Sequence, residues 1–170
     1  MRLRNIEKPI IGAINGVAAG AGANIALACD ITFASNKASF IQSFSSIGLI
    51  PDSGGTFFLP RLIGFQKASA LMLLGDKVSA AQAQDLGMIY KVFPPETFHQ
   101  EVHSLALHMA QLPTKALGLT KKLLNASFNN TLEQQLALES KLQIQAANSN
   151  DYKEGVSAFV EKRKPNFKGN

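Results

Sequence analysis

The chain has 170 residues, of which 46% are hydrophobic and 17% are charged. This composition is typical of a globular domain large enough to bury a core, and it excludes a disordered chain. The apolar runs are too short to cross a membrane, and the net charge of +5 is not accompanied by the aromatic platforms or recognition helix of a nucleic-acid-binding protein.

The basic side chains gather near the C-terminus, where a cluster comprises Lys162, Arg163, Lys164 and Lys168. Such a cluster indicates either a solvated tail or a docking point for a small phosphorylated ligand. At the other end, "MRLRNIEKPIIGAING" has only a short apolar stretch broken by glycine, so we expect neither a signal peptide nor a transit sequence. The lone Cys29 predicts a buried structural thiol in a cytoplasmic protein, because it has no partner for an intrachain disulfide.

The first part of the chain alternates between apolar strands and a helix. Residues 8–15, "KPIIGAIN", are short and β-branched, and they predict a buried strand. A glycine-rich loop follows, then a helix over residues 21–29 and two short strands over residues 30–35 and 38–44. Strand, tight loop, helix and strand in this order predict a βαβ unit of a parallel sheet.

Punctuating residues mark the next elements. A helix over "FQKASALMLLGD" is closed by Gly75. Ser79 and Gln82 have the spacing of a capping box at the start of another helix, and Gly87 has the place of its C-terminal stop. Residues 88–94, "MIYKVFP", predict a strand that ends at two prolines.

From residue 95 the pattern is helical as far as Lys164. Its breaks fall at Pro113, Asn129–Asn130 and Asn150. Capped helix starts are indicated at Thr131, with Glu133 and Gln134, and at Asp151, with Glu154. We therefore expect a β/α part over residues 1–95 and a helical region over residues 96–170.

The glycines of residues 16–22, "GVAAGAG", fit neither of the common phosphate-binding patterns. Ile25 stands where the dinucleotide motif G-x-G-x-x-G needs its last glycine, and no G-K-[ST] follows. Two interpretations remain open. The unhindered backbone N–H groups at the start of a helix could stabilise a developing oxyanion, or the small residues could simply allow close packing.

Three segments in this order resemble the enoyl-CoA hydratase/isomerase (crotonase) family: "KPIIGAINGVAAGAGANIALACDITFAS", "IGLIPDSGGTFFLPRLIG" and "LLGDKVSAAQAQDLGMIYKVF". The closing "DYKEGVSAFVEKRKPNF" resembles the family's last helix, so the resemblance covers essentially the whole chain. It implies an α/β fold with a crotonase-like spiral βα core over residues 1–95, which lacks the family's N-terminal part. It also implies an all-helical oligomerisation region over residues 96–170 and a homo-oligomer, a trimer or a dimer of trimers.

The resemblance also implies the ligand. Members of the family hold an acyl-CoA thioester, so coenzyme A is part of the substrate and no separate cofactor or metal is expected. The carbonyl oxygen of the thioester becomes an enolate that receives two backbone N–H groups. One donor matches Ala21, flanked by Gly20 and Gly22, whose small size lets the oxygen approach the main chain.

The residues at the family's acid–base positions favour isomerisation. Asn24 and Phe44 stand where hydratases of the family carry two glutamates, so we expect these positions to contact the substrate without adding water. Asp52, in "IPDSGG", matches the catalytic aspartate of isomerase-like members, and Gly54 belongs to the same motif as a substrate-binding position.

Asp52 has an alternative interpretation from its neighbours alone. Pro-Asp-Ser-Gly suits a turn, in which the aspartate would only cap the helix that follows. A role as a base would be favoured by an apolar setting around the carboxylate. Such a setting could be supplied by Ile47, Leu49, Ile50, Phe57 and Phe58.

The wording of the motifs is closest to members that rearrange 1,2-epoxyphenylacetyl-CoA in phenylacetate breakdown. A Δ3-Δ2-enoyl-CoA isomerase and an enoyl-CoA hydratase remain alternatives. The resemblance further implies that Phe159 and Lys162 help cover the adenine and phosphates of coenzyme A. A hypothesis of another class is a catalytically silent, truncated chain that serves as a binding or structural subunit.

The histidines do not predict a metal site. His99, His103 and His108 share one predicted helix, and the first two have the i, i+4 spacing of a ligand pair. The acidic centre of an H-E-x-x-H motif is missing, so we expect a solvated helix face.

Overall fold

In the computed structural model, which describes residues 2–170, the chain divides into two units. One unit comprises Ile10–Ser104, and the other combines Leu105–Asn170 with the residues up to Pro9. The sequence placed the boundary at residue 95 instead. The difference arises because the first part of helix α6 (Phe98–Ala110), with the buried Phe98 and Val102, belongs to the β/α unit.

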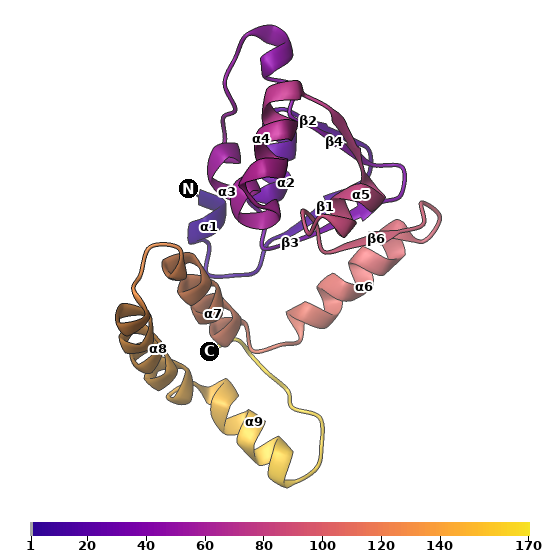
Figure 1. The fold of residues 1–170 in the computed structure, drawn as a ribbon. Helices are drawn as coiled ribbons and strands as arrows, with labels where there is room; N and C mark the ends of the chain where they lie inside the picture. The colour runs from indigo at the N-terminus through magenta and orange to yellow at the C-terminus, as the bar shows by residue number, and fades with distance from the viewer. Residues whose placement is uncertain (1) are drawn as a thin grey trace. The chain divides into compact units, whose positions relative to one another are not determined.

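The β/α unit contains two three-stranded sheets, whose strands are drawn as arrows in Figure 1. The first sheet is parallel, in the order β1 (Ile11–Ile14), β3 (Ile31–Ser35), β6 (Lys91–Phe93). In the second sheet, β2 (Val17–Ala19) pairs parallel with β4 (Ser39–Ile41), which pairs antiparallel with β5 (Lys77–Ser79). Within the described chain, β1 and β2 are therefore edge strands, each bonded on one side only.

The βαβ unit predicted from the sequence is confirmed, since β1 and β3 are parallel neighbours with Ile11 opposite Ile31. The helix between them, α2 (Ala21–Leu27), buries Ala23, Ala26 and Leu27 to at most 4% exposure. Alanine on the buried face lets a helix approach its neighbours closely, so the core can be dense with few large side chains. The three-residue strands β2 and β5 were not predicted.

The remaining helices of this unit follow in order: the 3-10 turn η1 (Ser45–Ile47), α3 (Gly55–Ile63), α4 (Phe65–Leu74) and α5 (Ala80–Asp85). The predicted stop at Gly75 is confirmed by its left-handed φ of 75°, which glycine adopts without strain. The predicted capping box is confirmed as well, because Ser79 and Gln82 exchange side-chain and main-chain hydrogen bonds. No helix in the described residues combines the length and apolar character that spanning a bilayer requires.

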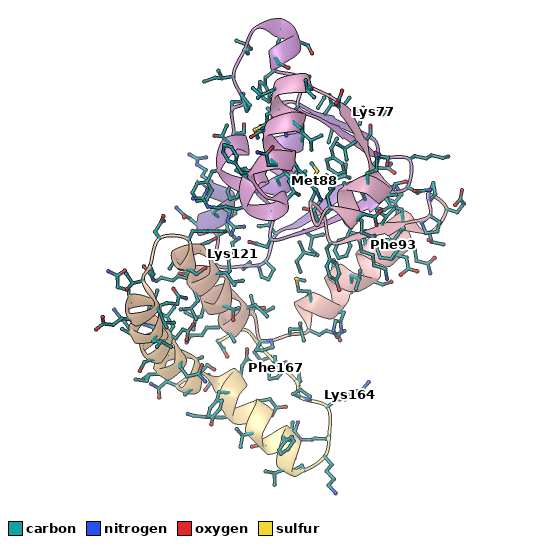
Figure 2. All side chains as sticks on the ribbon, in the orientation of Figure 1. Lys77, Met88, Phe93, Lys121, Lys164 and Phe167 are labelled. Atoms are coloured by element: carbon teal, nitrogen blue, oxygen red, sulfur yellow. The ribbon has the colours of Figure 1, made fainter. Side chains whose placement is uncertain are left out.

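The second unit is helical: α1 (Arg2–Asn5), α7 (Thr114–Ser127), α8 (Leu132–Ala147) and α9 (Asn150–Val160). The capping box of Thr131 and Gln134 is confirmed at the start of α8. The first residues join this unit through Lys121, labelled in Figure 2, whose buried ammonium donates to Leu3 O at 2.8 Å and Lys8 O at 3.1 Å.

The start of α9 differs from the prediction. Its N-cap is Ser149, whose hydroxyl accepts a hydrogen bond from the N–H of Tyr152 at 3.0 Å. Asp151 is the second residue of the helix. The buried carboxylate of Asp151 instead accepts the N–H groups of Lys168 at 2.6 Å and Gly169 at 2.8 Å. The acidic residue therefore fastens the C-terminal tail to α9 rather than capping the helix.

Candidate active site

The glycine loop forms a tight turn between β2 and α2. Gly20 has φ 53° and ψ −124°, a conformation that side chains strongly disfavour, and its N–H donates to Ile41 O at 2.9 Å. The first i→i−4 hydrogen bond of α2 runs from Asn24 N to Gly20 O at 3.2 Å. The N–H groups of Ala21 and Gly22 precede that bond, so they are among the helix amides without an intrahelical acceptor. Ala21 is half-buried and Gly22 is exposed.

Phe44 lies beneath this turn. A Cβ added to Gly20 would lie 3.6 Å from Cζ of Phe44, which is an ordinary packing distance. The ring is only 6% exposed, so the structure places Phe44 inside the core and not on an open surface. The ring packs against the Gly20 turn from the core side.

Asn24 is also inside the core, at 0% exposure. Its Nδ2 donates to the main-chain oxygen of Asp52 at 2.9 Å, and its Oδ1 accepts from Nε2 of Gln42 at 2.8 Å. One turn of α2 thus carries Ala21 and Gly22 at the surface and Asn24 within. The polar side chain of Asn24 joins this helix to the segment that contains Asp52.

Asp52 begins an unusual turn before α3. Ser53 has φ 50° and Gly54 has φ 82°, so two successive residues are left-handed, and the N–H of Gly55 donates to Asp52 O at 2.8 Å. The N-cap of α3 is Gly54, with no side-chain capping bond. The alternative interpretation of Asp52 as a helix cap is therefore wrong.

The apolar setting expected around the Asp52 carboxylate is not formed by the described residues. Asp52 itself is exposed, and so are Ile47, Leu49 and Ile50, at 70%, 60% and 83%. Phe57 and Phe58 are half-buried and stack edge to face, with ring centroids 5.2 Å apart. Ile47, Leu49 and Ile50 therefore form an exposed apolar surface in the segment that precedes Asp52.

The two remaining candidates lie on the helical unit. Phe159, near the end of α9, is 85% exposed, and the exposed Lys162 follows the helix with φ 53°. Their neighbour Arg163 forms a salt bridge to Glu154 at 2.6 Å. Hydrogen bonding by Arg163, together with the N–H of Asn166, lowers the pKa of Glu154 to about 2. One of the four clustered basic groups, Arg163, is thus already paired with a side chain of α9.

The histidines and the cysteine do not form a metal site in the described residues. The described residues contain no group of three or more His, Cys, Asp or Glu side chains arranged to hold a metal ion. His99, His103 and His108 are exposed on α6, as predicted. Cys29 is half-buried rather than buried; it follows the C-cap of α2, and its Sγ donates to Ile25 O at 3.5 Å.

The site contains two residues that the sequence did not single out. Gln42 orients Asn24, and Gly55 receives the Asn24 carboxamide against its backbone: an added Cβ would lie 2.3 Å from Nδ2. For Gln42, the available signal was a polar residue inside the apolar segment "ASFIQSF". For Gly55, the two glycines that follow Asp52 and Ser53 indicated only a turn.

Comparison with known proteins supplies the context for this geometry. The profile of the enoyl-CoA hydratase/isomerase family matches residues 1–170. The chain is 51% identical over 168 residues to a protein named 1,2-epoxyphenylacetyl-CoA isomerase from Escherichia coli K12, a match that covers 99% of this chain and 64% of that protein. It is 42% identical over 166 residues to the mitochondrial enoyl-CoA hydratase of Pongo abelii, covering 98% of this chain and 57% of the relative.

A solved structure gives the same result for the fold. An enoyl-CoA hydratase from Polaromonas sp. JS666 superposes with a TM-score of 0.93 at 37% identity, over 98% of this chain and 65% of that one. The superposition confirms the predicted α/β architecture with its C-terminal helices. This chain spans less than two thirds of the length of each of these three proteins.

Proposed function

Because the chain belongs to the enoyl-CoA hydratase/isomerase family, as its match over residues 1–170 establishes, we propose that it isomerises an acyl-CoA thioester. The observation that carries this proposal is the connection between two loops. The glycine turn before α2 and the turn of Asp52 are joined by the buried side chain of Asn24. Coenzyme A enters as part of the substrate.

The N–H of Ala21 is the proposed donor to the thioester oxygen. When a proton leaves the carbon beside the carbonyl, the electron pair moves to this oxygen, and the enolate is stabilised by backbone donors fixed in advance. Support comes from the Gly20 turn, which leaves the amide of Ala21 before the first hydrogen bond of α2. Gly20 and Gly22, without side chains, would let the thioester approach.

Asp52 is the proposed base. Its carboxylate removes a proton beside the carbonyl, becomes a carboxylic acid, and returns the same proton further along the acyl chain. The product is an isomer of the substrate, so no other reactant is consumed. Support comes from the hydrogen bonds to Asp52, both of which end on its main-chain oxygen and leave the side chain available.

Hydration is the less favoured alternative. Water addition in the family uses two glutamates, whereas this chain has Asn24 and Phe44 at the matching positions, both of them buried. For the acyl group we propose a 1,2-epoxyphenylacetyl-CoA type of substrate, which rests on the 51% identity to a protein of that name. A Δ3-Δ2-enoyl-CoA isomerase would use the same residues.

A second candidate is a binding or structural subunit without turnover. The exposure of Asp52 and of Ile50, at 83%, favours it, because a carboxylate in water gains nothing from an apolar setting. We further propose that Phe159 and Lys162 cover coenzyme A, and that the helical unit supports a homo-oligomer in the cytoplasm. The exposed apolar residues of α9, Val156, Phe159 and Val160, are consistent with such contacts.

The test is deuterium incorporation into phenylacetyl-CoA in D2O, followed by NMR, with calorimetry for binding of the same thioester. We expect the chain to exchange the protons beside the carbonyl, and Asp52→Asn to abolish exchange while the dissociation constant stays within about twofold. Exposed Asp76→Asn is the matched control and should exchange as the unmodified chain does. Full exchange in Asp52→Asn would refute the assignment, and binding without exchange by the unmodified chain would support the second candidate.

A further inference from the structure

We infer that Asn24 and Gln42 are positioning residues that hold the Asp52 turn against α2 through a buried amide relay. The inference rests on the proposed function for its catalytic consequence. Its structural content is a chain of hydrogen bonds from Gln42, which follows β4, through Asn24 of α2 to the turn before α3, and this content rests on the geometry alone. Neither residue needs to touch the substrate.

Burial gives the relay its strength. Asn24 is 0% exposed and Gln42 is 3% exposed, and an amide placed in a core without hydrogen bonds costs folding free energy. The contacts from Gln42 Nε2 to Asn24 Oδ1, at 2.8 Å, and from Asn24 Nδ2 to Asp52 O, at 2.9 Å, offset part of that cost, while Gln42 Oε1 has no hydrogen-bond partner among the described residues. The two buried amides are therefore bonded to each other, and that of Asn24 is also bonded to the main chain of Asp52.

The direction of both amides is determined by chemistry. A main-chain oxygen only accepts hydrogen bonds, so Asn24 must turn Nδ2 toward Asp52. Its Oδ1 then faces Gln42, which must present Nε2. A carboxylate at either position has no donor and would leave an acceptor facing an acceptor. The relay thus requires both a donor and an acceptor at position 24, which an amide supplies, and a donor at position 42.

The turn needs such an external hold. Ser53 is a non-glycine residue at φ 50°, and left-handed backbone of this kind is disfavoured unless its surroundings fix it. Asp52 O accepts two hydrogen bonds, from Asn24 Nδ2 and from Gly55 N, at 2.9 and 2.8 Å. Because the carboxamide of Asn24 also packs against Gly55, a shift of Asn24 would displace both ends of the turn.

The consequence for catalysis is geometric. A base displaced by about 1 Å from its productive position can lose about a hundredfold in rate. The relay fixes the main chain of Asp52 relative to the helix that starts at Ala21. In the proposed reaction, the carboxylate of Asp52 and the N–H of Ala21 must both face one thioester. Loosening the relay should therefore lower turnover and leave substrate binding in place.

The experiment compares Asn24→Asp and Gln42→Met with a control, Ser39→Ala, at the first residue of β4, the strand that Gln42 follows. Ser39 is 3% exposed, and its hydroxyl has no hydrogen-bond partner among the described residues. The readouts are NMR hydrogen exchange at Gly55 N–H, deuterium exchange of phenylacetyl-CoA at saturation, the dissociation constant of that thioester, and thermal unfolding by circular dichroism.

We expect either relay variant to slow deuterium exchange by about ten- to a hundredfold, with thioester affinity within about twofold, and to accelerate hydrogen exchange at Gly55. Because Gln42 acts through Asn24, the double variant should be no slower than Asn24→Asp alone. Ser39→Ala should leave the deuterium exchange of the thioester and the thioester affinity unchanged. Additive losses in the double variant, or full turnover in a folded Asn24→Asp, would overturn the inference.

A measurement on the unmodified chain covers the case in which a variant does not fold. The side-chain NH2 of Asn24 should exchange with solvent about a hundredfold more slowly than that of the exposed Asn5. Equal exchange rates would overturn the relay. Failure of the proposed function is distinguishable, because full activity of Asp52→Asn would refute the catalytic role while the exchange rates of Gly55 and Asn24 still decide the relay.

Discussion

A Cβ added to Gly55 would lie 2.3 Å from Nδ2 of Asn24, so the first residue of α3 has its side-chain space filled by α2. Gly55→Ala is therefore expected to lower the free energy of unfolding by about 1–3 kcal/mol, the usual cost of overpacking a core. Urea unfolding followed by circular dichroism measures it. Gly22→Ala is the control: nothing lies within 4 Å of its added Cβ, and alanine in a helix should add up to about 1 kcal/mol. A larger loss in the control would contradict the packing described.

Ser39→Ala is expected to stabilise the β/α unit. The hydroxyl of Ser39 is buried and makes no hydrogen bond within the described chain. Folding therefore removes this hydroxyl from water without a replacement hydrogen bond, and alanine avoids that cost in free energy. The expected gain is about 1 kcal/mol in the same urea measurement. Thr32→Val provides the contrast, since the Thr32 hydroxyl donates to Ala26 O at 2.8 Å and its loss should destabilise the chain by about 1–3 kcal/mol. Equal effects of the two changes would count against the hydrogen-bond assignment.

Asp151→Asn is expected to release the C-terminal tail. Both oxygens of the buried carboxylate accept main-chain N–H groups, and an amide would present its own N–H to one of them. Limited trypsin digestion should then cut after Lys168 faster than in the unmodified chain. The exposed Asp76→Asn should leave this cleavage rate unchanged, and an unchanged rate in Asp151→Asn would contradict the fastening described.

The pair of Glu154 and Arg163 predicts a dependence on pH. The pKa of Glu154 falls from 4.5 to about 2 on folding, mainly through its hydrogen bond with Arg163. A lowered pKa means that this contribution to stability is complete above pH 4.5 and is lost as the pH falls through about 2. As the pH is lowered across this interval, the melting temperature of the unmodified chain should therefore fall more than that of Glu154→Gln.

The control for this prediction is salt. Both side chains of the pair are on the surface, so added salt should reduce the difference between the unmodified chain and Glu154→Gln. The same acid dependence in both proteins would show that Glu154 does not supply it.

Local patterns in the sequence predicted local structure well. The capping boxes at Ser79 and Thr131 were predictable because each is completed within three residues. Asp151 was assigned wrongly as a helix start because its carboxylate binds a segment 17 and 18 residues further along. The strands β2 and β5, with three residues each, are too short to show an alternating pattern.

The candidate site divides in the same way. The glycine turn and Asp52 were found through motifs contiguous in the sequence. Gln42 was not, because its contact with Asn24 joins residues 18 positions apart on different elements. The exposure of Ile50 was also not predictable, since an apolar residue beside an aspartate says nothing of what covers it.

The position of β2 at the edge of its sheet bears on the glycine turn. A strand bonded along one side opens more readily than an interior strand, and β2 runs directly into Gly20. If Ala21 donates to a thioester oxygen as proposed, the position of its amide depends on a three-residue strand whose outer main-chain groups have no strand beside them in the described chain. A further strand paired along Val17 and Ala19 would then limit the opening of β2 and hold that amide in place.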